Sequence, residues 1–358
     1  MQSNNNSFSL RFLKNKAAVF ALLFIFLVLI IAIFAYLIAP ENSSNANRII
    51  PEIGSKKPGF SIYLLKTKQR ESAQENFFTI VLNGKSDNFF YTPITEYKIL
   101  KDSLYYQKFI DEDITENKVI KIQGSNFEEN NIIKQTFYLG TDKFGRDILS
   151  RLIIGSRVSL GVGCIAAIIS LTIGVFLGAV AGYFKGKTDN VIMLLINIVW
   201  SIPTLLLVFA ITLVLGKGFW QVFIAVGLTM WVNVARLVRG QVMIAKELEY
   251  IEAARVLGFN HFRIIVKHIL PNIIGPILVI TAANFAGAIV IEAGLSFLGI
   301  GVQPPQPSWG LMIKDHYNFI VTNNAILALI PGIAIMLLVL AFNILGNGLR
   351  DALNVRTT

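Results

Sequence analysis

The stretch EYIEAARVLGFNHFRIIVKHILP, residues 249–271, is a polar segment set between two long apolar runs. It predicts two short helices joined by a tight turn, because Gly258 suits a left-handed helix end and Asn260 can cap the helix that follows. Pro271 is expected to stop or bend the second helix just before the next apolar run. A chain this apolar that keeps such a segment is expected to present it to a partner.

The composition places the chain among membrane proteins. Of its 358 residues, 54% are hydrophobic and 15% are charged, and the mean hydropathy is +0.60, which is not typical of a soluble domain. The formal net charge is +10, but the basic residues lie largely in short loops beside apolar runs, where they orient a protein in a bilayer. This placement argues against a nucleic-acid partner. The single Cys164 can form no intrachain disulfide.

Six apolar runs predict six membrane spans, the fourth shorter than the others. They are residues 17–39, 158–184, 191–215, 219–235, 273–300 and 325–348. The lysines and arginines between them place both termini and the 246–272 segment in the cytoplasm.

Two of these runs contain residues that suggest a transport pathway. Trp200 and Pro203 predict a bend in the third run, which forms either a pathway wall or a simple packing kink. The fifth run contains Glu292. At ~1.5 Å per residue from residue 273, its carboxylate is expected about 28 Å along the helix, near the outer interface. There, hydration is favoured over a role at the pathway mouth.

Residues 41–138 are different in character, being rich in Asn, Lys, Glu and Ser. Strand-like stretches at 78–82 and 89–92, with Asn-Gly and Asp-Asn turn signals between them, predict a small domain that contains a hairpin. Partial disorder is the alternative. Alternation from the first span places this insertion outside the cytoplasm. The chain is therefore divided into residues 1–40, 41–138 and 139–358.

A second motif, LGTDKFGRDILSR, occupies residues 139–151 just before the second span. Thr141 or Asp142 can cap a helix here. The charged side chains keep the segment at a membrane surface rather than within the bilayer.

Both motifs resemble those of binding-protein-dependent ABC importer permeases, and 249–271 resembles the cytoplasmic coupling loop of that family. The residues that match the loop are Glu252, Ala253, Ala254, Gly258, His268, Leu270 and Pro271. The earlier motif resembles the one in dipeptide, oligopeptide and nickel permeases, through Gly140, Thr141, Asp142, Gly145, Arg146 and Asp147. The string LSFLGIGVQPPQPSWG at 295–310 resembles the signature of the C-type permease chain. His268 departs from the general pattern, which has an apolar residue there, and the insertion is longer than the family's usual outer segment.

The resemblance implies an all-α membrane protein of the type I ABC importer permease fold, with six transmembrane helices and an insertion that contains β-structure. Such a subunit lies in the bacterial inner membrane and forms half of a pathway for di- or oligopeptides. Its partners are a second homologous permease chain, two ATPase subunits and an extra-cytoplasmic substrate-binding protein. The resemblance implies no catalytic residue, cofactor or metal on this chain, because ATP hydrolysis takes place on the ATPase subunits.

Several alternatives stay open at this stage. The same machinery can import nickel or another small solute, and the 249–271 segment can be an amphipathic helix that lies on lipid. An ion-coupled secondary transporter needs ionisable groups at membrane depth, and the spans offer only Glu292 near an edge. An intramembrane enzyme needs convergent catalytic groups or metal ligands within the spans. Residues 181–188 fit a relaxed phosphate-loop pattern, but they lie between two membrane helices rather than between a strand and a helix.

Overall fold

The computed structural model describes residues 2–68, 76–100, 103–111, 114–121, 131–216, 218–320 and 325–353. The chain forms two compact units. The helical unit contains residues 1–29, 159–303 and 333–358. The second unit contains residues 30–158 and 304–332, and we call it the outer unit after the side of the membrane that the sequence predicts for it. The three-part division expected from the sequence stays a prediction.

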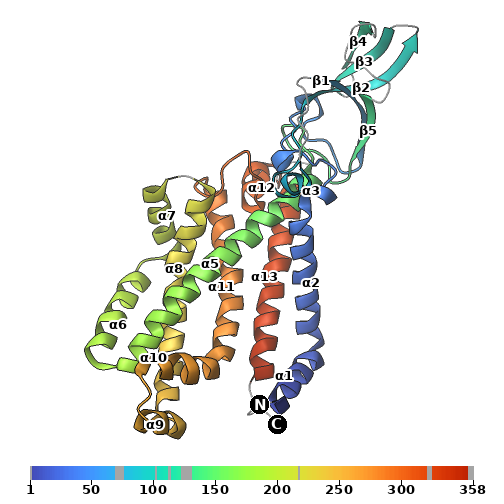
Figure 1. The fold of residues 1–358 in the computed structure, drawn as a ribbon. Coiled ribbons are helices and arrows are strands. Elements are labelled where there is room, and N and C mark those ends of the chain that lie inside the picture. The colour runs from blue at the N-terminus through green and yellow to red at the C-terminus, as the bar shows by residue number, and fades with distance from the viewer. Residues whose placement is uncertain are drawn as a thin grey trace. The chain divides into compact units, whose positions relative to one another are not determined.

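Helices dominate the described chain (Figure 1). They are α1 Gln2–Lys14, α2 Lys16–Ile33, α3 Ala35–Ile38, α4 Phe77–Asn83, α5 Ile148–Phe184, α6 Gly186–Ser201, α7 Thr204–Leu215, α8 Phe219–Lys246, α9 Glu249–Val256, α10 His261–Ile264, α11 Ile274–Phe297, α12 Trp309–His316 and α13 Ile326–Leu353. Within the described residues, five helical segments are long and apolar enough to cross a membrane, and α6 with α7 makes a sixth if the bent pair is one span. The predicted all-helical membrane fold is confirmed.

The third, fourth and sixth spans each have a feature of their own. The third breaks between α6 and α7, which meet at 94°, so the bend expected at Pro203 is confirmed. The fourth was predicted to end near residue 235, but α8 continues to Lys246 because its polar last turns extend the helix beyond the apolar run. In the sixth, Pro331 lies inside α13 near its start.

A row of glycines lets α5 pack closely against α8. A Cβ atom built on Gly178 would lie 2.5 Å from the carbonyl oxygen of Ala235, and one on Gly174 would lie 2.7 Å from that of Trp231. Gly182 approaches the carbonyl of Arg239 in the same way. The glycine spacing of four therefore marks a helix-packing face inside this chain.

The outer unit contains a five-stranded antiparallel sheet with the order β4-β3-β2-β1-β5. The strands are β1 Phe60–Lys68, β2 Phe89–Leu100, β3 Ser103–Asp111, β4 Ile114–Lys121 and β5 Ile132–Phe137. One buried cluster joins Leu64 of β1, Phe109 of β3 and Phe137 of β5 to Ile50 and Ile53. The predicted β-structure of the insertion is confirmed.

One strand prediction in the insertion is right and the other is wrong. Residues 89–92 begin β2, but the stretch predicted as a strand at 78–82 lies in helix α4. A short apolar run does not by itself distinguish a strand from a helix. Here α4 packs against α3, and Gly84, with a φ of +79°, lies just past its end.

Candidate functional site

The 249–271 segment folds as two helices around a glycine turn, as predicted. Gly258 has a φ of +77° between α9 and α10, and the side chain of Asn260 accepts a hydrogen bond from the backbone N–H of Arg263 at 2.7 Å. After α10 the helical path continues through a π-turn at Ile265–Ile269 and a 3-10 turn at Leu270–Ile273 before α11 begins. Pro271 therefore distorts the helix without ending it, because it lies at the start of the 3-10 turn.

One side of the 249–271 segment packs against the long helices of the helical unit. Ile251 and Ala254 of α9 are buried in one apolar cluster with Ile264 and Ile269 and with the C-terminal parts of α5 and α8. The hydroxyl of Tyr183, at the end of α5, lies 2.8 Å from Nδ1 of His261. α9 and α10 are therefore packed directly against α5 and α8.

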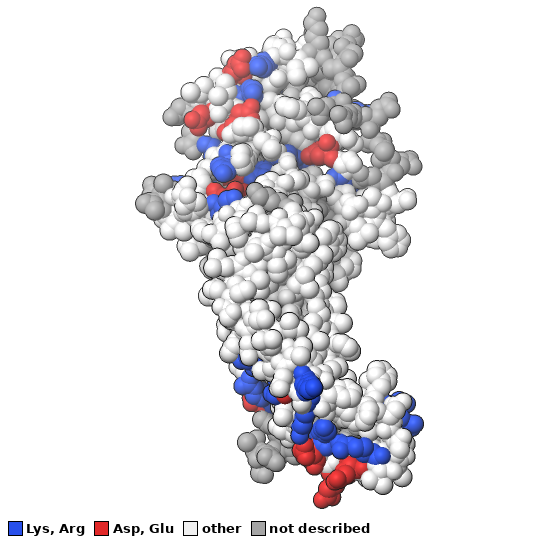
Figure 2. Space-filling model, turned by 90° about the vertical axis from the view of Figure 1, so that its left-hand side faces the viewer, with Lys and Arg blue, Asp and Glu red and all other residues white. Residues whose placement is uncertain are grey.

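The exposed side of the segment carries three large apolar side chains among its charged residues. Val256, Leu257 and Phe262 are 84%, 73% and 74% exposed, respectively. Charged residues surround them, and Figure 2 shows these charges crowded at the end where α9 lies in Figure 1, below a broad uncharged surface. An exposed apolar patch with a charged rim is typical of a protein docking surface. We call Val256, Leu257 and Phe262 the coupling patch.

The structure divides the residues matched to the coupling loop between this surface and the interior. Glu252, Ala253, Gly258 and Pro271 are exposed, Ala254 is buried, and His268 and Leu270 are half-buried. The ring of His268 stacks on the ring of Phe259, with centroids 5.7 Å apart. The guanidinium of Arg263 also lies over the Phe259 ring, 4.3 Å from its centroid. The loop thus presents some of its motif and uses the rest to hold its shape.

The second motif, at 139–151, is almost wholly buried in the outer unit. Asp142 Oδ2 accepts a hydrogen bond from Arg146 Nε at 2.6 Å, and Asp142 Oδ1 accepts from the backbone N–H groups of Phe144 and Arg146. Arg146 also donates to Asn47 Oδ1 at 3.1 Å and lies 3.6 Å from Asp315 of α12. We call Asn47, Asp142, Arg146 and Asp315 the outer lock, because they join three segments that are distant in the sequence.

The glycines of this motif are required by its backbone. Gly140 and Gly145 have φ values of +80° and +75°. A Cβ atom at either position would collide with a backbone carbonyl, that of Lys56 or that of Ile50. The Thr141 hydroxyl donates to the carbonyl of Ile53 at 2.5 Å. These residues therefore fasten the motif to the 50–56 segment.

The helix cap of α5 lies later than the sequence analysis predicted. Asp147, rather than Thr141 or Asp142, caps α5 by accepting hydrogen bonds from the backbone N–H of Ser150 at 3.0 Å and from its hydroxyl. Asp142 is instead committed to Arg146, which explains the error. Burial raises the pKa of Asp147, although the bonds from Ser150 oppose the rise.

A buried histidine lies beside the outer lock. His316 is almost fully buried at the end of α12, and its Nδ1–H donates to the carbonyl of Met312 at 2.6 Å. Burial lowers the pKa of His316, while Asp142 and Asp315 act in the opposite direction. The neutral imidazole is the form that this site favours.

The break between α6 and α7 lies beside a cavity of about 180 Å³ in the helical unit. Trp200 is one of its lining residues, with Thr229 and Asn233 of α8 supplying polar groups. Arg236 lies over the Trp200 ring at 3.7 Å from the centroid and donates to Asn197. Pro203 lies within the break, directly before α7. The choice between a pathway wall and a packing kink at this bend stays a prediction.

Glu292 differs from its expected environment. The prediction of a hydrated carboxylate is wrong, because Glu292 is fully buried within α11 and accepts a hydrogen bond from the Ser296 hydroxyl at 2.6 Å. The Ser296 oxygen in turn accepts from the backbone N–H of Val302 at 3.0 Å. Glu292 thus organises the chain that follows α11 rather than facing solvent.

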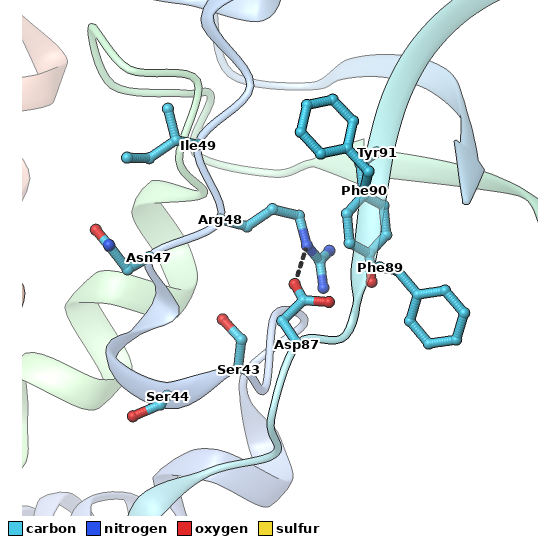
Figure 3. Close-up of a pocket in the computed structure, with 9 residues that line it drawn as sticks. All are labelled: Ser43, Ser44, Asn47, Arg48, Ile49, Asp87, Phe89, Phe90 and Tyr91. Carbon is cyan, nitrogen blue, oxygen red and sulfur yellow. Dashed lines mark hydrogen bonds and ion pairs between the residues drawn. The ribbon is translucent and has the colours of Figure 1, made fainter. Parts of the chain in front are cut away.

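A further pocket of about 300 Å³ lies in the outer unit, between the 43–49 segment and the start of β2 (Figure 3). Its central cation, Arg48, is paired with Asp87 at 2.9 Å and lies over the Tyr91 ring at 3.7 Å. Burial raises the pKa of Tyr91 to about 12. Arg48 therefore joins the 43–49 segment to the segment that leads into β2. In the part of the chain that the structure describes, no group of His, Cys, Asp and Glu is placed to hold a metal ion.

Comparison with known proteins agrees with this geometry. A family profile described as "binding-protein-dependent transport system inner membrane component" matches residues 174–358. The chain belongs to this family. A second profile, described as the N-terminal TM domain of oligopeptide transport permease C, matches residues 7–57 of the permease.

Curated relatives resemble the permease over most of their own length. The glutathione transport system permease protein GsiD of Pectobacterium atrosepticum is 42% identical over 217 residues, which is 61% of this chain and 72% of the relative. The dipeptide transport system permease protein DppC of Bacillus subtilis is 40% identical over 233 residues, which is 65% and 73% of the two chains. Among solved structures, the inward-facing MetNI methionine ABC transporter aligns with a TM-score of 0.48 and 17% identity, covering 58% of the permease and 98% of that chain.

Sequence reasoning missed two features of the permease. The coupling patch was missed because apolar residues at helical spacing usually face a core, and only their exposure shows otherwise. Asn47 and Asp315 of the outer lock were missed because they lie far from the motif in sequence. Asp315 lies in α12, which begins at Trp309, and nothing near it in the sequence indicates a contact with Arg146.

Proposed function

We propose that this permease subunit imports di- or oligopeptides across a bacterial inner membrane, with both of its termini in the cytoplasm. Its relatives are named as permeases of dipeptide, oligopeptide and glutathione transport systems, which supports a cargo with peptide character. The subunit forms half of a pathway together with a second homologous permease chain. An extra-cytoplasmic binding protein delivers the cargo.

The observation that carries the proposal is the coupling patch. The coupling patch is exposed, and its segment is packed against α5 and α8. A partner that binds the patch can therefore move these two helices. We assign its partner as one of two ATPase subunits, which hydrolyse ATP on separate chains. This chain itself supplies no catalytic residue and holds no cofactor.

Transport follows from this linkage by alternating access. Closure of the ATPase pair around ATP moves α9 and α10, and the buried contacts of Ile251 and Ala254 pass the movement to the spans. The break at Pro203, with Trp200 and the polar groups of Thr229 and Asn233 beside it, is the part of the pathway that changes shape. Gly258 forms the turn between α9 and α10, and Glu252 is exposed on α9, where the ATPase subunit can reach it.

Reconstitution tests the proposal directly. The subunit is co-purified with its accompanying chains from native membranes and placed in proteoliposomes with ATP inside. We expect accumulation of labelled dipeptide that depends on ATP and on the binding protein. ATP-dependent accumulation of Ni²⁺ without peptide uptake would replace the cargo with nickel, and peptide uptake driven by an ion gradient without ATP would overturn the proposal.

A further inference from the structure

Helix α4, in the outer unit, carries an apolar face that no described residue covers. Its sequence FFTIVLN contains no charge, none of its residues is buried, and Phe77, Phe78 and Leu82 are all exposed. Three large apolar side chains on a helix of this length are costly in water.

Several contacts hold this helix firmly to the end of the first apolar run. A Cβ atom on Gly84 would lie 2.9 Å from the ring of Tyr36 in α3. Arg157 donates to the carbonyls of Val81 and Leu82 at 3.2 and 3.0 Å and lies over the same Tyr36 ring. The carbonyls at the end of α4 are thereby satisfied, as a helix terminus requires.

The segment after α4 is fastened to the residues that follow α3. The backbone N–H of Lys85 donates to the carbonyl of Asn42 at 2.9 Å, and the ion pair of Arg48 with Asp87, visible in Figure 3, follows directly. These contacts fix the orientation of α4, so its exposed face is a defined surface.

The position of α3 identifies what this surface meets. At ~1.5 Å per residue, a helix over residues 17–39 is about 35 Å long, slightly more than the hydrocarbon thickness of about 30 Å. Its last residues, including Tyr36, therefore lie at the outer interface, where tyrosine is favoured. Leu37 and Ile38 of α3, the helix against which α4 packs, are also exposed and apolar, so exposed apolar side chains occur on both helices at this level.

We propose that α4 is an interfacial helix whose Phe77, Phe78 and Leu82 enter the outer leaflet of the bilayer. Arg157 and Lys85 then lie at the level of the lipid headgroups, as basic residues beside an interfacial helix do. The helix holds the start of β2 at a constant depth relative to the first span, through Asp87. This assignment is independent of the transported cargo.

Spin labelling of the full chain in nanodiscs of phosphatidylethanolamine and phosphatidylglycerol tests the proposal. The exposed Cys164 is first replaced by serine, and single cysteines are introduced as Phe78→Cys or, as a matched control on β2, Phe90→Cys. Phe78 and Phe90 are 79% and 63% exposed, so neither label disturbs a core. We expect a severalfold higher ratio of oxygen to nickel-complex accessibility at position 78 than at position 90.

Two results would overturn the assignment. Equal ratios at both positions would show that α4 faces water. A label at 78 that neither oxygen nor the nickel complex reaches would show that another protein chain covers α4. Leu82→Cys provides a second reporter on the same face if the Phe78 variant inserts poorly, and the same ratios apply to it.

Discussion

The 249–271 segment, which we call the coupling segment, and the motif at 139–151 that forms the outer lock both contain glycines and charges. The molecule uses them in opposite ways. The coupling segment exposes Glu252, Gly258 and an apolar patch, while its buried side holds it in place. The outer lock buries Asp142 and Arg146 and exposes almost nothing. A motif can therefore signal an interface or an internal fastening, and burial of its charges distinguishes the two.

The largest effect is expected from breaking the outer lock. Asp142→Ala removes the closer carboxylate from the buried Arg146 and leaves it only the 3.6 Å ion pair with Asp315, and removal of one partner from a buried ion pair costs about 3–5 kcal/mol. We expect a large fall in the midpoint of thermal unfolding of the purified subunit. Lys143→Ala is the control, because its pair with Asp315 is long and partly exposed and such pairs contribute below about 1 kcal/mol. Equal midpoints for both variants would contradict the lock.

A change in the coupling patch is expected to separate stability from function. Leu257→Asp alters an exposed side chain, so the free energy of unfolding is expected to change by about 0.5 kcal/mol or less. Docking of the ATPase subunit is expected to weaken by about 2 kcal/mol or more, the loss typical of a central interface residue. Binding of the purified ATPase subunit to the variant, measured beside thermal unfolding, checks both. Unchanged ATPase binding would remove the patch from the interface.

A smaller effect sharpens the role of the turn within the coupling segment. Asn260→Ala removes the cap of α10, and loss of such a cap costs about 1 kcal/mol. We expect faster hydrogen exchange confined to the amides of residues 261–264, with transport reduced and not abolished. Asn272→Ala is the control, since it lies beyond α10. Unaltered exchange at these amides would show that the cap contributes nothing.

The smallest effect is a pH dependence in the outer unit. The lowered pKa of folded His316 means that the unfolded chain binds a proton first as the pH falls below about 6.5. The free energy of unfolding therefore decreases as the pH falls from about 6.5 toward the lower pKa of folded His316. Above about pH 6.5, titration of His316 leaves the stability unchanged. His316→Asn keeps a donor to Met312 without titrating, so its unfolding midpoint is expected to fall less on acidification. Parallel pH profiles for variant and parent would contradict this account.

The comparison also shows what a sequence can and cannot reveal. The turn at Gly258, the cap at Asn260 and the bend at Pro203 follow from rules that act over a few residues, and all three were predicted. The helix at 77–83 and the cap at Asp147 were not, because each depends on partners elsewhere, namely Tyr36 with Arg157 in one case and Asp142 with Arg146 in the other. The depth predicted for Glu292 stays a prediction, and the burial of its carboxylate was missed because it depends on the contacts of Ser296 and Val302, which follow it in the chain.

The central claim is that the coupling patch receives force from an ATPase subunit. The most direct test places a photo-crosslinking amino acid at position 257, with a second variant at position 90 in the outer unit as the control, and illuminates intact membranes. We predict a covalent adduct with a nucleotide-binding subunit from position 257 and none from position 90. An adduct from position 257 with an extra-cytoplasmic protein, or no adduct with any nucleotide-binding chain, would contradict the account.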